Sequence, residues 1–125
     1  MSAAVTVLVA DDEPDLLILT SATLEKAGFD VVEQVVDGNE ALAAVTRLDP
    51  PPVPTVVVLD YMMPGLSGLD VAERILAAHP DQRIVLFSAY LDEDVRRRAA
   101  DIGVSACVSK SKLRELPSIV SSLAG

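Results

Sequence analysis

Short apolar runs alternate along the chain with segments in which apolar positions recur every three or four residues. Three of the runs are nearly continuous in Val, Leu and Ile, which indicates strands covered on both faces of a parallel sheet. The second run alternates more regularly between apolar and polar residues, so we expect it to form an edge strand. The predicted strands cover residues 5–10, 31–36, 55–59, 83–87 and 105–109.

Local start and stop signals divide the intervening segments into five helices. Pro14 suits the first turn of the first helix, and Gly28 suits its C-terminal end. Ser67 and Asp70 have the spacing of a capping box, and Asp92 is placed to start the fourth helix. The predicted helices cover residues 14–28, 39–48, 68–78, 93–102 and 117–123.

This alternation predicts an α/β fold of the (βα)₅ type. Right-handed crossovers place helices on both faces of a doubly wound, five-stranded parallel sheet, and the expected flavodoxin-like strand order is 2-1-3-4-5. We expect residues 1–125 to form a single domain. The proline-rich stretch DPPPVP at 49–54 is too short for an interdomain linker and predicts a stiff connection into the third strand.

Composition narrows the possible functions. Half of the 125 residues are hydrophobic, which is enough for a core, and the net charge of −9 argues against a dedicated nucleic-acid binder. The chain has one cysteine, Cys107, which cannot form an internal disulfide and favours a reducing compartment. The N-terminus does not resemble a signal peptide, and no apolar run reaches the ~18 residues of a membrane span. We therefore expect a cytoplasmic protein.

Polar and charged residues follow the predicted strands at their carboxyl ends. Parallel strands present these ends at one edge of the sheet, where ligands bind in such folds. Three neighbouring carboxylates repel one another, and a hard cation such as Mg²⁺ relieves that repulsion. A carboxylate can also act as a nucleophile towards phosphorus. The residues at this edge are Asp11, Asp12, Asp60, Ser88 and Lys110.

Four motifs at these strand ends resemble those of one known family. They are VLVADDEP, VVVLDYMMPGLSG, VLFSAY and CVSK. Each motif is weak alone, but together and in this order they are specific. The sequence resembles the receiver domain of two-component response regulators over essentially its whole length.

The resemblance implies a phosphoacceptor and a Mg²⁺ site. Asp60 is the implied phosphoacceptor and also a metal ligand. Asp12 is implied to bind Mg²⁺ directly, Asp11 through water or directly, and Met62 through its backbone carbonyl.

The resemblance also implies contacts to the phosphoryl group. Ser88 is implied to bond to this group, and Ala89 leaves room beside it. Lys110 is implied to pair with the acceptor or its phosphate, so that Asp60, Ser88 and Lys110 form the reacting set. Pro64 and Gly68 match the family's loop after the acceptor.

The resemblance implies that the phosphoryl group comes from a histidine kinase or a histidine phosphotransfer protein. The protein would not be an enzyme in the usual sense, although it could promote its own phosphorylation and dephosphorylation. Output would pass to a downstream protein, or to a second copy in a homodimer, through the surface of 93–102, 105–109 and 117–123. We expect no direct contact with nucleic acid or membrane, and either a stand-alone receiver or part of a longer regulator.

The densest basic run, Arg96, Arg97 and Arg98, lies in the predicted fourth helix. We interpret it as a solvated helix face that pairs in part with nearby acids, and a docking patch is the alternative. The acids expected to take part are Asp92, Glu93, Asp94 and Asp101.

The chain departs from the family pattern at two positions. Receivers usually carry an aromatic residue three positions before the site lysine, where this chain has Cys107. The switch expected from Ser88 and position 107 therefore lacks its ring. Ser111 stands where the family usually has proline, and because a cis bond before a residue other than proline costs ~3 kcal/mol, we expect a trans bond or a rearranged loop.

Met62 and Tyr90 occupy positions that influence access of the hydrolytic water in receivers. Both side chains are bulky and uncharged, so the resemblance predicts slow self-dephosphorylation.

Three other interpretations compete with a phosphorylated receiver. A pseudo-receiver would bind proteins without phosphorylation, as the substitutions at Cys107 and Ser111 would allow. A flavodoxin-like FMN carrier would need a phosphate-binding loop where this chain has the acidic ADDEP. An aspartyl phosphohydrolase would place its nucleophile after the first strand, with a second Asp two residues later.

Overall fold

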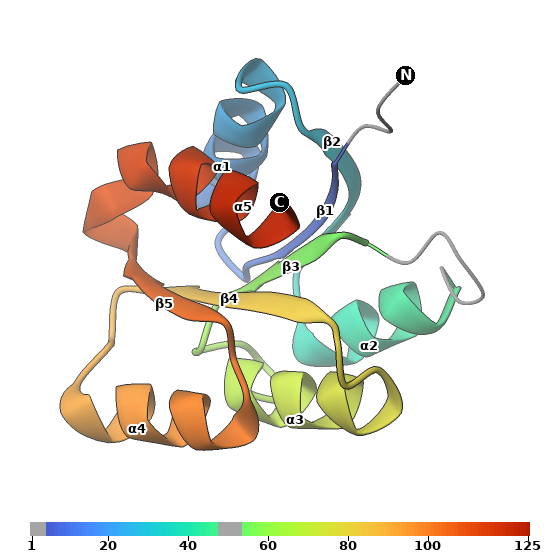
Figure 1. Ribbon diagram of the computed structural model, residues 1–125, viewed down its shortest axis with the longest axis vertical. Helices are drawn as coiled ribbons and strands as arrows, with labels where there is room; N and C mark the ends of the chain where they lie inside the picture. The colour runs from blue at the N-terminus through green and yellow to red at the C-terminus, as the bar shows by residue number, and fades with distance from the viewer. Residues whose placement is uncertain (1–4, 48–53) are drawn as a thin grey trace.

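The computed structural model, which describes residues 5–47 and 54–125, contains a parallel sheet with helices on both faces (Figure 1). The strands are β1 (Thr6–Ala10), β2 (Asp30–Val35), β3 (Val56–Leu59), β4 (Arg83–Ser88) and β5 (Ala106–Ser109). The helices are α1 (Pro14–Lys26), α2 (Gly38–Arg47), α3 (Gly68–Ala78), α4 (Glu93–Ile102) and α5 (Leu116–Ala124), and a 3₁₀ helix, η1 (Lys110–Glu115), precedes α5.

The strand order is β2-β1-β3-β4-β5, and every pair of neighbours is parallel. This order confirms the predicted fold and the edge position of the second strand. The observed strands differ from the predicted ranges by one residue at most at either end. The strands β1, β3, β4 and β5 lie side by side and run in the same direction. Their carboxyl ends therefore lie along one edge of the sheet.

The helices form two layers, with α1 and α5 on one face of the sheet and α2, α3 and α4 on the other (Figure 1). Successive side chains of a strand point to opposite faces. In β1, Val7 and Val9 therefore pack in the core beneath α1 and α5, while Leu8 and Ala10 join the core beneath the other three helices. This two-sided burial explains why the central strands are almost continuously apolar.

The predicted helix signals act as expected. Pro14 opens α1, and Ser67 and Asp70 form a reciprocal capping box at the start of α3. The Asp92 side chain accepts a hydrogen bond from the backbone N–H of Val95 and caps α4. Gly103 ends α4 with a φ of 107°, a left-handed conformation that residues with a Cβ rarely adopt.

The segment after β5 differs from the prediction of a loop followed by a helix at 117–123. Ser109 accepts a hydrogen bond from the backbone N–H of Ser111 and caps a 3₁₀ helix, which is interrupted at Lys112 (φ −112°, ψ 36°). Helix α5 then begins one residue earlier than predicted, because Leu116 has helical dihedral angles and is fully buried. The rearranged loop expected at Ser111 is thus a 3₁₀ helix.

The predicted stiff connection at 49–54 lies outside the described residues, apart from Pro54. None of the helices in the described ranges combines the length and the hydrophobicity that crossing a bilayer requires.

Candidate functional site

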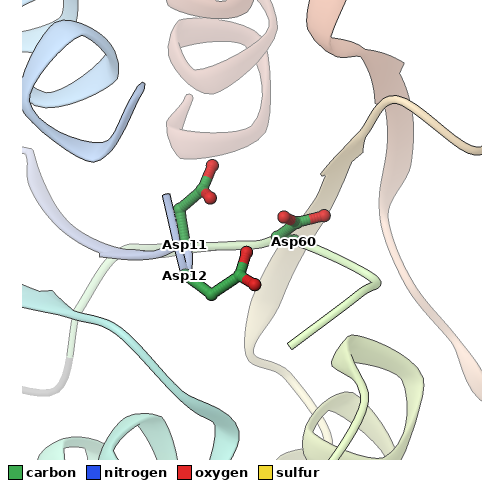
Figure 2. Close-up of side chains that lie close together, drawn as sticks. All are labelled: Asp11, Asp12 and Asp60. Atoms are coloured by element: carbon green, nitrogen blue, oxygen red, sulfur yellow. The ribbon is translucent and has the colours of Figure 1, made fainter. Parts of the chain in front are cut away.

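Three carboxylates meet where two central strands end. Asp11 and Asp12 follow β1, and Asp60 follows β3, which pairs directly with β1. One oxygen from each side chain lies within 4.8 Å of the others, and Figure 2 shows the three groups around a common space. Asp11 and Asp60 are buried, with 2% and 4% of their surfaces exposed, whereas Asp12 is open to solvent.

Lys110 places its ammonium group among these carboxylates. Its Nζ lies 2.8 Å from Oδ2 of Asp60 and 3.0 Å from Oδ2 of Asp11. A third contact, 3.6 Å long, reaches Oε1 of Glu13. Sequence reasoning missed Glu13, although its position directly after the acidic pair was a signal. Only 11% of the Lys110 side chain is exposed, so its largely buried ammonium group offsets part of the negative charge.

The pKa values of two groups respond to this arrangement. Burial alone would lower the pKa of Lys110, but its hydrogen bonds to Asp60 and Asp11 outweigh that effect and raise it. Burial raises the pKa of Asp11, and this outweighs the opposing hydrogen bonds from the Glu13 backbone and from Lys110. Lys110 is therefore held as a cation, while the anionic form of Asp11 is disfavoured by its burial.

The backbone fixes the position of Asp60. Its N–H donates to the carbonyl of Ala10, so the residue still belongs to the hydrogen-bond ladder of the central strands. The Met62 N–H donates to Oδ1 of Asp60 over 3.3 Å, and the Gly68 N–H closes the loop on the Tyr61 carbonyl over 2.9 Å. A Cβ on Gly68 would overlap the carbonyl oxygen of Asp60, so this loop requires glycine.

A small cleft opens beside Asp60. Its volume is about 100 Å³, which leaves room for about three groups of the size of a water molecule. Ser88, at the end of β4, is 1% exposed, and its Oγ accepts a hydrogen bond from the Tyr90 N–H over 3.3 Å. Small-molecule pockets usually measure ~300–1,000 Å³, so this cleft does not suit a flavin. Its lining residues are Asp12, Glu13, Asp60, Met62, Ser88, Ala89, Tyr90 and Lys110.

The donor set fits a hard divalent cation. Mg²⁺ prefers oxygen ligands in octahedral geometry and keeps several waters, so a few carboxylates at the rim of a cleft suit it. Asp12 extends its carboxylate towards the side on which Asp60 lies (Figure 2). Met62 follows closely in the chain, and its side chain is 56% exposed at the mouth of the cleft.

Two predicted features lie outside the cleft. Cys107 lies in β5, three residues before Lys110, and borders a different hollow between α4 and α5. The predicted pairing of the arginine run with acids is wrong for the described residues: Arg96 donates to the Leu91 carbonyl, and Arg98 to the Tyr61 hydroxyl. Leu91 lies in the loop before α4, and Tyr61 lies in the loop that follows β3.

Comparisons with known proteins agree with this geometry. Residues 7–121 match the response regulator receiver domain. The chain belongs to this family. A protein-glutamate methylesterase/protein-glutamine glutaminase of Caulobacter vibrioides is 33% identical over 114 residues, which are 88% of this chain and 31% of that protein. The DNA-binding response regulator MtrA of Mycolicibacterium smegmatis is 40% identical over 86 residues, 69% of this chain and 35% of that protein.

Solved receivers have the same fold. The signal receiver domain of the response regulator NarL from Mycobacterium tuberculosis superposes with a TM-score of 0.89 and 28% identity, covering 98% of both chains. This receiver spans about a third of the length of the curated relatives. The similarity therefore does not carry over the methylesterase activity or the DNA binding named for those proteins. Receiver domains of response regulators interact with histidine kinases.

Proposed function

We propose that Asp60 is the phosphoacceptor of a signalling switch formed by residues 1–125. The observation that carries this proposal is the buried Asp60 carboxylate, which has Lys110 at 2.8 Å and two further carboxylates within 4.8 Å. Such a constellation is costly for folding, because buried like charges repel. A role in handling a phosphoryl group accounts for it.

The residues divide the transfer chemistry between them. An oxygen of Asp60 attacks phosphorus, the bond from phosphorus to the donor's imidazole nitrogen breaks, and the imidazole leaves with the electron pair. Lys110 neutralises charge on the phosphoryl oxygens. The Ser88 hydroxyl donates to one of these oxygens while it keeps accepting from the Tyr90 N–H, since a hydroxyl can do both.

Mg²⁺ is the proposed cofactor, held by Asp11, Asp12, Asp60 and the backbone carbonyl of Met62. When bound, it supplies positive charge that brings the anionic donor and the acceptor together. The three carboxylates provide oxygen ligands, and Lys110 leaves negative charge to be balanced.

The donor is proposed to be a histidine kinase or a histidine phosphotransfer protein. Output is proposed to pass through the surface of α4, β5 and α5 to a downstream protein or to a second copy. Lys110 links this surface to the cleft because it directly follows β5. Cys107 lacks the ring of the usual switch, so Ser88 and the loop after it would carry the change. The lone cysteine favours a cytoplasmic location.

Intact mass measurement after incubation with acetyl phosphate and Mg²⁺ tests this function. We expect one phosphoryl group on the wild type, none on Asp60→Asn, and none after EDTA treatment. Asp37→Asn is the control, because this carboxylate caps α2 away from the cleft and should leave the adduct intact. An adduct on Asp60→Asn would refute the assignment.

A Mg²⁺ titration separates the pseudo-receiver from the phosphoacceptor if no adduct forms. Metal binding that Asp12→Asn weakens would indicate a receiver that needs its own kinase. Absence of metal binding would favour the pseudo-receiver.

A further inference from the structure

A second hollow, which we call the β5 pocket, lies beside the edge strand and has a volume of about 200 Å³. In Figure 1, β5 forms one side of the sheet, with α4 on one face and α5 on the other. Its lining residues are Arg96 of α4, Cys107, Val108 and Ser109 of β5, Lys112 and Glu115 of η1, and Ile119 of α5.

The size of the β5 pocket suits one side chain. It is smaller than the ~300–1,000 Å³ of typical small-molecule sites. Val108 is 4% exposed, whereas Cys107 and Ile119 are partly exposed, so these residues offer accessible apolar surface within a lining that is otherwise polar. Interfaces commonly concentrate their binding energy where one bulky side chain fills such a pocket.

The rim of the β5 pocket is mainly basic. Arg96 and Lys112 are exposed, and neither makes an ion pair within the described residues, while Glu115 is the one acid in the lining. Arg96 and Cys107 both line the pocket, so the guanidinium lies beside the pocket wall. The chain as a whole has a charge of −9, but charges farther away than ~8 Å are largely screened at physiological ionic strength.

We propose that the β5 pocket binds one bulky apolar side chain from an acidic segment of a partner protein. Cys107 and Ile119 contact the side chain, and Arg96 and Lys112 pair with neighbouring carboxylates of the segment. This inference rests on the proposed function in one respect, because it specifies the partner of the output surface named there. Binding itself does not require that Asp60 be phosphorylated.

The pocket and the cleft are connected through two neighbouring strands, β5 and β4. Cys107 pairs with Leu86 of β4, and Ser109 pairs with Ser88, whose hydroxyl faces the cleft. Ser109 directly precedes Lys110. A shift of Ser88 or Lys110 at the cleft therefore acts on the residues that line the pocket, so phosphorylation can change the pocket's shape.

Disulfide trapping at Cys107 tests the recognition chemistry. Mixed disulfides of cysteamine with benzyl, 4-carboxybenzyl and 4-(aminomethyl)benzyl thiols serve as probes. The Cys107 thiolate attacks the benzylic sulfur, cysteamine leaves as the thiol, and intact mass reports the adduct on the chain's single cysteine. We expect the carboxybenzyl adduct to exceed the benzyl adduct severalfold and the aminomethyl adduct to be lowest. Equal adducts in folded and urea-unfolded protein would overturn the proposal.

Matched variants identify the residues responsible. Arg96→Gln and Lys112→Gln should each lower the ratio of carboxybenzyl to benzyl adduct, because they remove the cations of the rim. Arg97→Gln and Arg114→Gln should leave it unchanged, since these exposed arginines lie outside the pocket lining. The ratio cancels any general change in thiol reactivity. If the ratio of carboxybenzyl to benzyl adduct were the same in all four variants, Arg96 and Lys112 would not be the cations that recognise the carboxylate.

A peptide probe tests docking itself. A labelled acidic peptide with one Phe between Asp residues should bind the wild type, and its Phe→Ala version should bind at least tenfold more weakly. Cys107→Phe fills the pocket and should weaken the first peptide similarly, with a circular dichroism spectrum confirming the fold. Equal binding of both peptides would contradict the proposal. A dimer seen by light scattering that Cys107→Phe dissociates would replace the partner with a second copy.

These measurements are made without Mg²⁺ or acetyl phosphate, so they are independent of the phosphoryl chemistry. Loss of peptide selectivity with an intact Asp60 adduct would refute only the pocket. Selective binding without any adduct would support the pocket, and the Mg²⁺ titration would then decide between a receiver that needs its own kinase and a pseudo-receiver.

Discussion

Lys110 Nζ lies 2.8 Å from Oδ2 of Asp60, although 50 positions separate the two residues in the chain. The contact spans the sheet from the end of β5 to the end of β3. It gives a buried carboxylate a cationic partner, and it places that partner where a metal would compete for the same oxygens. The stability of the domain and the affinity of its proposed metal site are therefore linked through one side chain.

Replacing Lys110 with Met should change these two properties in opposite directions. Removal of one partner from a buried ion pair leaves uncompensated charge, so the free energy of unfolding without metal should fall by about 3 kcal/mol. Mg²⁺ affinity should rise, because the competing cation is gone. Urea unfolding and a Mg²⁺ titration measure the two effects. Lys112→Met, an exposed control, should change stability by less than about 0.5 kcal/mol; an equal cost in both variants would show that the ion pairs contribute nothing.

Asp11 should make the unfolding free energy fall as pH rises from acid towards neutral. Burial raises its folded-state pKa above the ordinary 3.8, so the folded protein keeps this proton when the unfolded chain has lost it. Stability then decreases with pH between 3.8 and the folded pKa, and levels off above it.

The Asp11→Asn variant has no carboxyl group to titrate at this position, so its unfolding free energy should not fall for this reason as pH rises. Its stability relative to wild type, measured by urea unfolding in EDTA, should improve across that pH range. Asp15→Asn, which removes an exposed acid nearby, is the matched control. A wild-type minus Asp11→Asn difference that is independent of pH would contradict the assignment.

The sequence predicted the fold well because the decisive signals are local. The nearly continuous apolar strands, the capping box at Ser67 and the proline at Pro14 each act within a few residues. The segment after Lys110 was predicted less well. Its 3₁₀ helix depends on the Ser109 cap and on the burial of Leu116 against other elements, which no local pattern reveals.

The candidate site was predictable as a set of residues but not as a set of contacts. Strand order alone brings Asp11, Asp60 and Lys110 to one edge of the sheet. The third contact of Lys110, to Glu13, depends on how far a flexible side chain reaches, and so does the bond from Arg98 to Tyr61. Both follow from tertiary geometry.

Mg²⁺ should stabilise the folded protein. A ligand that binds only the folded state at 100 times its dissociation constant adds about 2.7 kcal/mol to the unfolding free energy. Asp12→Asn should lose most of this gain, because Asp12 is the exposed member of the carboxylate group. Thermal unfolding over a Mg²⁺ series measures the effect at constant ionic strength. Asp15→Asn should keep the full gain, and equal gains in both variants would exclude Asp12 as a ligand.

Gly68→Ala should destabilise the loop that holds Asp60. The added methyl group would overlap the Asp60 carbonyl oxygen, so the backbone must move, at a cost of about 1–3 kcal/mol. Chemical denaturation measures this loss. Gly125→Ala is the control, since its nearest neighbour would lie at an ordinary 3.5 Å. A Gly68→Ala variant with the same unfolding free energy as the wild type would show that the loop has more room than the structure indicates.

Met62 and Tyr90 should slow hydrolysis of the phosphorylated protein. Both side chains border the cleft, and they are 56% and 67% exposed, so they stand between solvent and the proposed phosphoryl group. Met62→Asn combined with Tyr90→Glu should shorten the phosphoryl lifetime at least severalfold, as measured by intact mass over time. Met63→Asn lies outside the cleft lining and serves as the control. An unchanged lifetime in the double variant would count against this role.

The position of Asp60 in the sheet also implies two different rates of hydrogen-bond opening within the domain. Its N–H donates to the Ala10 carbonyl between central strands, and hydrogen bonds in core strands have the highest opening free energies, up to that of global unfolding. The β5 edge and η1 lie at the periphery, where local opening is faster. We therefore expect the proposed acceptor to keep its position until the domain unfolds, while the proposed output surface beside it opens locally far more often.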